Sequence, residues 1–158
     1  MGSNKGICGF GFFPILLFAF FLSGCATPSI VLDIRADETL NPDLHGQSYS
    51  VMVRMYQLKT AEEFQQADYQ LLLEQGSSVL GTSLLKQEEF IVEPGEHQRL
   101  EFLREDGAQY HGVVAFFRRV DGEHWRASGK LKNGLLRPMT THSELKLKNT
   151  QIDLARTH

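Results

Sequence analysis

The side chains best suited to chemistry are few and scattered along this sequence. Six histidines occur, and no two of them show the His-x-x-His or His-Glu-x-x-His spacing that places metal ligands on one helical face. The sequence also lacks the Gly-x-Ser-x-Gly motif of a serine nucleophile and the glycine-rich loops that hold phosphates. His111 beside an apolar run is typical of a packing residue. The sequence therefore predicts no catalytic residue, no metal site, no cofactor and no small-molecule substrate.

One cysteine is distinguished by the residues before it. Cys25 follows a positive residue, Lys5, and an apolar run over residues 10–22, which is the order found in an export signal. The run is about 13 residues long, whereas a membrane-spanning helix needs about 20. Its end, "LSGC", resembles the lipobox of bacterial lipoproteins, in which the chain is cut before the cysteine and the thiol is acylated. We predict that residues 1–24 are a cleaved signal peptide and that residues 25–29 are a lipidated tether. The alternatives are a cleaved signal with an incidental cysteine, or a poor membrane helix.

The remaining composition restricts the compartment and the partners. Cys8 and Cys25 are the only cysteines, so the chain after the signal has no spare thiol for a disulfide. Ala26 stands where an Asp would resemble an inner-membrane retention signal, so we expect the outer membrane, periplasmic face, with acyl chains on Cys25 as the anchor. Removing the first 24 of the 158 residues leaves 134, which suits one domain. Fifteen basic and nineteen acidic residues remain there, without a basic run, so no nucleic-acid partner is expected.

The elements that must carry any site are mostly strands. Residues 29–36 and 50–58 alternate between apolar and polar positions, as half-buried strands do. Residues 60–76 change to a helical period, with a capping box from Thr60 to Glu63 and with Gly76 as a possible end. Residues 113–117 are apolar on both faces, which is typical of a central strand in a covered sheet.

Turn residues separate the later strands at regular intervals. Pro94-Gly95, Asp106-Gly107, Asp121-Gly122 and Asn133-Gly134 lie between alternating runs, and such pairs favour hairpins. The last strands are expected at residues 144–148 and 151–155. Seven or eight short strands with one helix predict a mainly β domain over residues 30–158. A β-sandwich is the favoured arrangement and a barrel is the alternative. Trp125 is expected in its core.

The segment between the first two strands is too long for a simple hairpin. Residues 37–49 contain Asn41-Pro42, Asp43 and Gly46, which are turn formers, and loops of about 12 residues or more often have a function. Leu40 and Leu44 are apolar positions in a polar loop, so we expect them to be exposed and to form an interface core. The acidic residues of the loop would favour basic residues on a partner. A solvated connector is the alternative interpretation.

Several short strings occur in one order and carry a family resemblance. They are "LNPDLHG" (40–46), "VMVRMYQLK" (51–59), Phe64 with Ala67 and Asp68, "VEPGE" (92–96), "YHGVVAFFR" (110–118) and "WR" (125–126). Behind a lipobox, this ordered set resembles the TssJ (SciN-like) lipoproteins of the bacterial type VI secretion system. The resemblance covers essentially the whole chain after the signal.

The resemblance implies a transthyretin-like two-sheet β-sandwich with one added amphipathic helix, and a structural rather than enzymatic role. That role is to anchor the membrane complex of the secretion system to the outer membrane by binding the periplasmic C-terminal region of TssM. The loop between the first two strands would be the contact, so the expected partner-binding residues are Asp37, Glu38, Leu40, Asn41, Pro42, Asp43, Leu44, His45 and Gly46. Two other functions remain open: a lipid-anchored periplasmic ligand-binding or chaperone-like module, and a lipid-anchored hydrolase.

Overall fold

A computed structural model of the chain describes residue 2 and residues 27–120, 122–135 and 137–157. The predicted signal peptide, apart from residue 2, and the predicted lipidation site, Cys25, lie outside these residues. The described part contains eight strands and two α-helices. The strands are β1 (Ser29–Ala36), β2 (Val51–Leu58), β3 (Leu84–Val92), β4 (His97–Leu103), β5 (Tyr110–Phe116), β6 (Arg126–Lys130), β7 (Thr141–Lys148) and β8 (Gln151–Thr157). The helices are α1 (Glu62–Gln66) and α2 (Tyr69–Leu80), and a 3₁₀ turn (Gly81–Ser83) follows α2.

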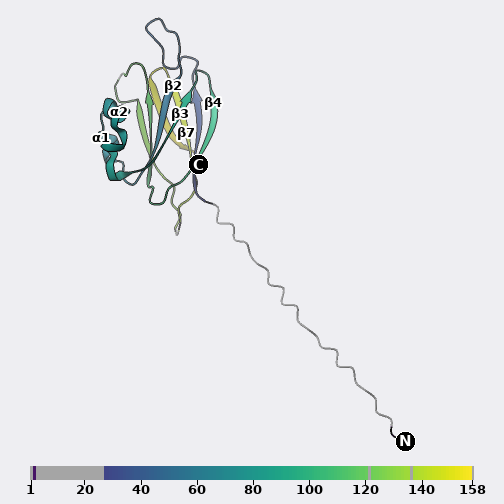
Figure 1. The fold of residues 1–158 in the computed structure, drawn as a ribbon. Coiled ribbons are helices and arrows are strands. Elements are labelled where there is room, and N and C mark those ends of the chain that lie inside the picture. The colour runs from purple at the N-terminus through teal and green to yellow at the C-terminus, as the bar shows by residue number, and fades with distance from the viewer. Residues whose placement is uncertain (1, 3–26, 121, 136, 158) are drawn as a thin grey trace.

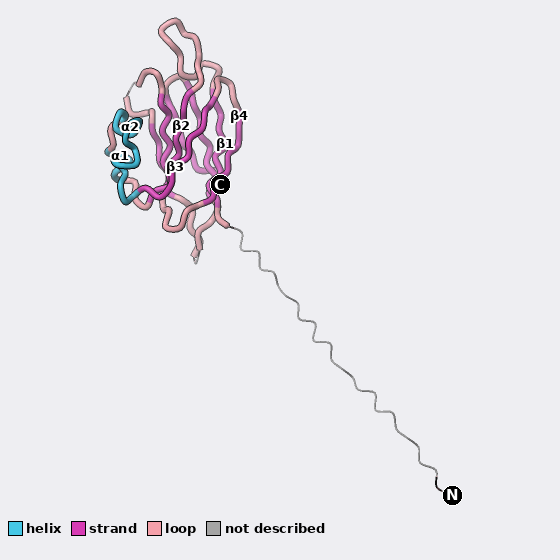
Figure 2. The backbone as a smooth tube through the Cα atoms, in the orientation of Figure 1, coloured by secondary structure: helices cyan, strands magenta, loops and turns pink. Residues whose placement is uncertain are grey.

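The strands form two separate four-stranded sheets that pack face to face (Figures 1 and 2). The first sheet has the order β4-β1-β7-β8, and the second has the order β3-β2-β5-β6. Strand β1 pairs antiparallel with β4 and parallel with β7. Two sheets rather than one closed sheet confirm the predicted β-sandwich and exclude the barrel for the described residues.

The core lies between the sheets and contains the inward side chains of the alternating strands. Leu32 and Ile34 of β1 face Val53 and Met55 of β2, and all four are buried. Strand β5 is the predicted central strand, with residues 113–115 completely buried. Trp125 is 4% exposed and its ring packs edge-on against Tyr69 at 5.1 Å, which confirms the expected core position.

The predicted single helix is two helices joined at a break. The chain is extended at Ala67, and the Asp68 side chain accepts a hydrogen bond from the Gln70 amide, so a new N-cap starts α2 there. Arg126 of β6 donates to the carbonyl oxygens of Phe64 and Ala67, which satisfies the last turn of α1. Gly76 lies inside α2 and does not end it. The expected end was wrong because apolar contacts of Val79 and Leu80 continue the helix past the glycine.

The helices pack on the outer side of the β3-β2-β5-β6 sheet (Figure 1). Phe64 of α1 is buried, and its ring lies over Gly112 of β5. A Cβ atom added to Gly112 would come within 2.8 Å of that ring. Glycine at this position of a central strand therefore makes room for the aromatic ring.

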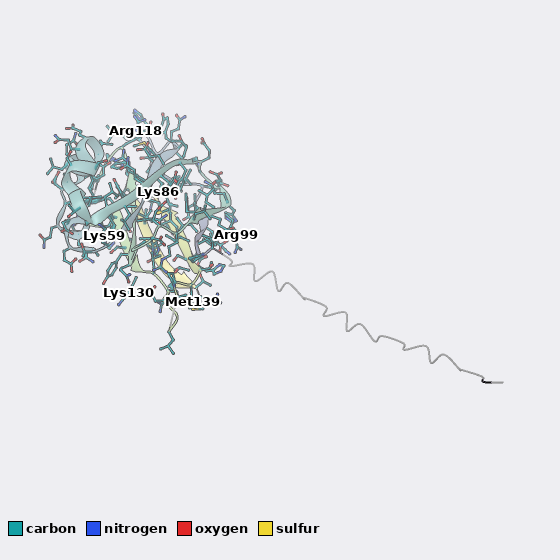
Figure 3. The ribbon with its side chains drawn as sticks, turned by 60° about the horizontal axis from the view of Figure 1, so that its bottom comes forward. Lys59, Lys86, Arg99, Arg118, Lys130 and Met139 are labelled. Atoms are coloured by element: carbon teal, nitrogen blue, oxygen red, sulfur yellow. The ribbon has the colours of Figure 1, made fainter. Side chains whose placement is uncertain are left out.

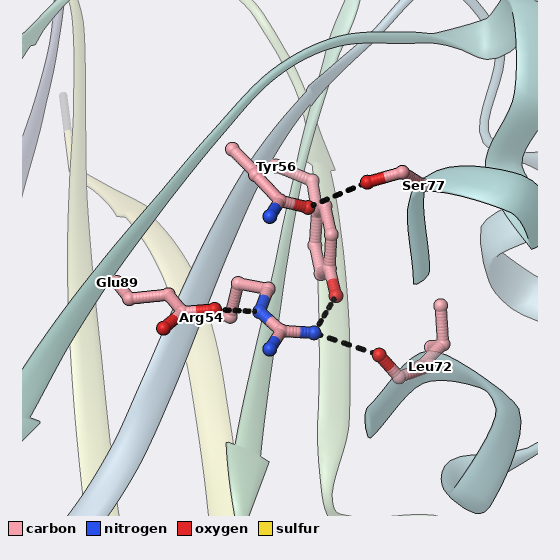
Figure 4. A network of polar contacts seen from close by, with 6 residues as sticks. Arg54, Tyr56, Leu72, Ser77 and Glu89 are labelled. Atoms are coloured by element: carbon pink, nitrogen blue, oxygen red, sulfur yellow. Dashed lines mark hydrogen bonds and ion pairs between the residues drawn. The ribbon is translucent and has the colours of Figure 1, made fainter. Parts of the chain in front are cut away.

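A buried arginine fastens α2 to the same sheet (Figure 4). Arg54 of β2 donates to the Leu72 carbonyl at 2.7 Å, to the Tyr56 hydroxyl at 3.1 Å and to Glu89 Oε1 at 2.6 Å. One guanidinium therefore joins β2, β3 and α2. Hydrogen bonds from a charged donor are among the stronger ones in proteins, so this cluster fixes where the helices lie.

Most of the expected hairpin turns connect the two sheets instead. The turns at Pro94-Gly95, Asp106-Gly107 and Asn133-Gly134 each join strands of different sheets, so the hairpin interpretation is wrong there. Alternation and turn residues indicate where a strand ends but not which sheet the next strand joins. Strands β5 and β6 do form a hairpin, and β7 and β8 form another across Asn149-Thr150.

The connections gather at two opposite ends of the sandwich. At one end, which we call the loop end, the β1–β2 loop (37–50) contacts residues 95, 118 and 149. At the other end, which we call the tether end, Pro28 lies beside residues 104 and 137–140. Figure 3 shows this separation, with Arg118 and Met139 labelled at opposite ends of the domain.

Candidate partner-binding surface

The β1–β2 loop is a folded segment held by backbone hydrogen bonds. The Asp37 amide donates to the Leu147 carbonyl at 2.9 Å, and the Asn41 amide donates to the Asn149 carbonyl at 2.7 Å. Within the loop, the Tyr49 amide returns to the Leu40 carbonyl at 3.1 Å. These bonds tie the base of the loop to the β7–β8 hairpin, so the loop has one preferred shape before any partner arrives.

Asp43 organises the tip of the loop. Its Oδ1 atom accepts hydrogen bonds from the His45 amide at 2.8 Å and from the Gln47 amide at 2.9 Å, and Oδ2 accepts from the Tyr49 hydroxyl at 3.4 Å. The Gln47 amide above all, with His45, Tyr49 and the charge of Arg118, lowers the pKa of the Asp43 carboxyl. Gly46 has a φ of +83°, which allows the chain to turn back. The Asp43 carboxylate therefore stabilises the folded conformation of the loop tip.

Leu40 and Asn41 are structural residues, which corrects our expectation for Leu40. Leu40 is completely buried and belongs to the main core, so it is not an exposed anchor. Asn41 is 3% exposed; its Nδ2 donates to the Ser50 carbonyl and its Oδ1 accepts from the Arg118 amide at 2.8 Å. A loop residue can face inwards without any periodic pattern, so the sequence did not separate these two residues from the exposed ones.

The exposed surface of the loop is centred on Leu44. This side chain is 82% exposed. Beside it lies an open hollow of about 370 Å³, lined by Pro42, Asp43, Leu44, His45, Arg118 and Arg119. We call these six residues the loop-end surface. An exposed leucine next to a hollow is the kind of feature that an interface covers.

The expected acidic residues of this end, Asp37, Glu38 and Asp43, share it with basic side chains. Asp37 forms an ion pair with Lys148 at 3.7 Å, and the Asp43 carboxylate accepts a hydrogen bond from the Gln47 amide of the same loop. The Glu38 carboxylate lies against Gly95. Arg118 and Arg119, by contrast, line the hollow beside Leu44. The loop-end surface therefore presents an apolar centre, with two arginines and the Asp43 carboxylate beside it.

Sequence reasoning missed Arg118 and Arg119, which come from the connection between β5 and β6. The Arg118 guanidinium stacks over the Tyr49 ring at 4.5 Å, a cation–π contact that links the two loops. Arg118 and Asn41 are 77 residues apart in sequence. Nothing local in the "FFRRV" string indicates this proximity; it follows from the sheet order, which places β5 beside β2.

Among the residues that the structure describes, the other titratable and metal-ligating side chains do not form a second site. Over residues 27–120, 122–135 and 137–157, no three His, Cys, Asp or Glu side chains are grouped so that they could hold a metal ion. His111 is 1% exposed, and its Nε2 atom lies 3.2 Å from Ser143 Oγ inside the core. Burial lowers the pKa of His111 to about 4. Within the described ranges, no helix combines the length and apolar character needed to cross a membrane.

The fold and this end surface define a small β-sandwich domain that presents a preformed loop. The chain belongs to the type VI secretion lipoprotein family that includes VasD, EvfM and TssJ, because the model of that family matches residues 28–150. This confirms the resemblance noted in the sequence. The family is one of structural lipoproteins and not of enzymes. No curated protein sequence matches the chain.

Solved structures of this family have the same fold. The T6SS lipoprotein TssJ1 from Pseudomonas aeruginosa is 29% identical, with a TM-score of 0.76, over 84% of this chain and 98% of that one. Serratia marcescens Lip, a membrane-bound component of the type VI secretion system, is 26% identical with a TM-score of 0.73, over 80% and 96%. A chain in a structure of the T6SS TssM C-terminal domain from EAEC is 28% identical with a TM-score of 0.68, over 82% and 98%.

Proposed function

We propose that this protein anchors the type VI secretion membrane complex to the outer membrane, on its periplasmic face. In this proposal, acyl chains on Cys25 hold the outer membrane, and the loop-end surface binds the periplasmic C-terminal region of TssM. The observation that carries the partner site is Leu44, an exposed leucine on a loop that is already folded. The similarity to a chain in a TssM C-terminal domain structure, and to another in a structure of the type VI membrane complex, supports the choice of partner.

A preformed loop suits a lasting contact. The hydrogen bonds of Asp43 and the stacking of Arg118 on Tyr49 fix the loop before binding, so little conformational entropy is lost when the partner is bound. Pro42 restricts the backbone further. The charge of Arg118 and Arg119 favours a partner segment that carries carboxylates around an apolar residue.

Calorimetry of the lipid-free chain from residue 26 onward with the periplasmic fragment of TssM tests the partner site. Leu44→Asp removes the exposed apolar centre and should weaken binding by about thirtyfold, since an interface anchor contributes about 2 kcal/mol. Arg118→Glu should also weaken binding, and added salt should reduce this difference because the effect is electrostatic.

The matched control is Leu135→Asp, because Leu135 is also a highly exposed leucine and lies at the tether end. This variant should bind TssM with the affinity of the unchanged chain. Unchanged affinity in a folded Leu44→Asp variant would place the contact elsewhere on the sandwich, and the β1–β2 loop would then be a connector.

A further inference from the structure

Exposed apolar side chains gather at the end of the domain where the tether enters. Leu135 is 99% exposed, Leu103 is 62% exposed and Met139 is 43% exposed. These three are half of the large hydrophobic side chains that are exposed in the described chain. Leu103 is paired with Ser29, the first residue of β1, and Met139 shares a hollow of about 260 Å³ with Pro28. We call Leu103, Leu135 and Met139 the tether-end patch. Figure 3 shows Met139 at the end opposite Arg118.

The turn that carries Leu135 is held in place by hydrogen bonds from a buried arginine. Arg104 is 7% exposed and donates to the Lys132 carbonyl at 2.6 Å and to Asn133 Oδ1 at 2.8 Å. The Gly134 amide donates to the Arg137 carbonyl at 2.9 Å, and the Met139 amide donates to the Lys132 carbonyl at 3.1 Å. A buried guanidinium therefore supports a turn whose apolar side chain reaches into solvent. Several large apolar side chains exposed together at one end form the kind of patch that a partner or a membrane covers.

The length of the tether limits what that surface can be. Four residue steps separate Cys25 from Ser29, and each step spans at most about 3.6 Å. The lipidated residue can therefore lie no more than about 14 Å from the start of β1. An acylated Cys25 would hold the tether end within about half a bilayer thickness of the membrane, so the nearest surface is the membrane itself.

The charges around the patch fit an anionic phospholipid surface. Lys130 and Arg137 are exposed beside the turn, and Lys132 is half-buried within it. Of the acidic groups next to Arg104, Asp106 is exposed and Glu105 is paired with Lys86 at 3.5 Å. Apolar side chains flanked by cations are the usual composition of segments that lie in a membrane interface.

We propose that the tether-end patch rests in the headgroup region of the phospholipid bilayer and is a second membrane contact beside the lipid anchor. This inference rests on the proposed lipidation of Cys25. The contact orients the sandwich with its long axis away from the membrane, so that the loop-end surface points into the periplasm towards its partner. An anchor at one point would leave the domain free to rotate about it, whereas a second contact fixes one orientation.

Site-specific labelling of the lipidated protein tests this contact. The full precursor is produced with Leu135→Cys, purified as the acylated form and placed in vesicles of phosphatidylethanolamine with a minority of phosphatidylglycerol. Because Cys8 leaves with the signal and Cys25 is acylated, the new thiol is the one that reacts with an environment-sensitive fluorophore. Leu44→Cys is the matched control, since both leucines are exposed and stand at opposite ends.

The label at position 135 should shift to the blue and be quenched several-fold more by bromine-labelled lipids than the label at position 44. Equal quenching at both positions in protein that floats with the vesicles would overturn the second contact and leave the anchor intact. Protein that does not float with the vesicles would overturn the anchor and the second contact together. A blue shift at position 135 without extra quenching by the bromine-labelled lipids would show burial against another protein copy and would also overturn the proposal.

Discussion

Leu40 and Leu44 stand four residues apart in one loop, and the structure gives them opposite roles. Leu40 is completely buried and Leu44 is 82% exposed. Replacing a buried leucine by alanine removes its transfer free energy and leaves a cavity, which lowers the free energy of unfolding by about 3 kcal/mol, or roughly 10 °C in Tm for a domain of this size. Leu44→Ala removes a side chain that is already in water, so the change should stay within about 0.5 kcal/mol.

Urea unfolding of the lipid-free chain, followed by the fluorescence of its single tryptophan, measures both values. Trp125 is buried, so its emission reports loss of the core. Leu40→Ala should lower the free energy of unfolding strongly, and Leu44→Ala should hardly change it. Among folded molecules, Leu44→Ala should weaken TssM binding, whereas Leu40→Ala should leave it nearly unchanged. Equal stabilities of the two variants would refute the view that the core fixes the loop.

Three further predictions concern buried groups and the loop tip. Burial lowers the pKa of His111 to about 4 from its ordinary 6.5, so between these pH values the unfolded chain binds more protons than the folded chain. The free energy of unfolding should therefore fall as the pH falls from 6.5 to 4. Urea unfolding of the His111→Gln variant should show a weaker dependence on pH in this range. Gly112→Ala should destabilise the domain by about 1–3 kcal/mol because its Cβ meets the Phe64 ring at 2.8 Å, and adding Phe64→Leu should recover part of the loss by making room; no recovery would contradict this cause. Asp43→Ala should speed amide hydrogen exchange at the tip of the β1–β2 loop without changing exchange in the core, whereas unchanged exchange would mean that Asp43 does not order the tip.

The strands were the most predictable part of this fold. Alternation in residues 29–36 and the apolar run at 113–117 give β1 and the central strand β5, because burial of one or both faces imposes a strict pattern. The break between α1 and α2 was missed, since Asp68 reads as an ordinary polar helix position until its side chain is seen capping the next helix. The parallel pairing of β1 with β7 was also beyond reach, because it joins segments more than a hundred residues apart.

The loop-end surface was predictable only in part. The length of residues 37–49 indicated a functional loop, and Leu44 proved to be exposed. Leu40 was assigned to the same surface because a loop has no periodicity that separates inward from outward side chains. Arg118 could not be found from the sequence, since its place beside Tyr49 depends on the order of strands in the second sheet.

The central claim is that one protein connects the outer membrane to TssM through its two ends. Vesicle capture tests it directly: the lipidated protein is placed in vesicles, the soluble C-terminal region of TssM is added, and the vesicles are floated through a density gradient. We expect TssM to float with the unchanged protein, to stay behind when Leu44→Asp protein floats, and to stay behind together with Cys25→Ser protein, which should not float itself. Capture of TssM by vesicles that carry the folded Leu44→Asp protein, or flotation of the Cys25→Ser protein, would contradict this account.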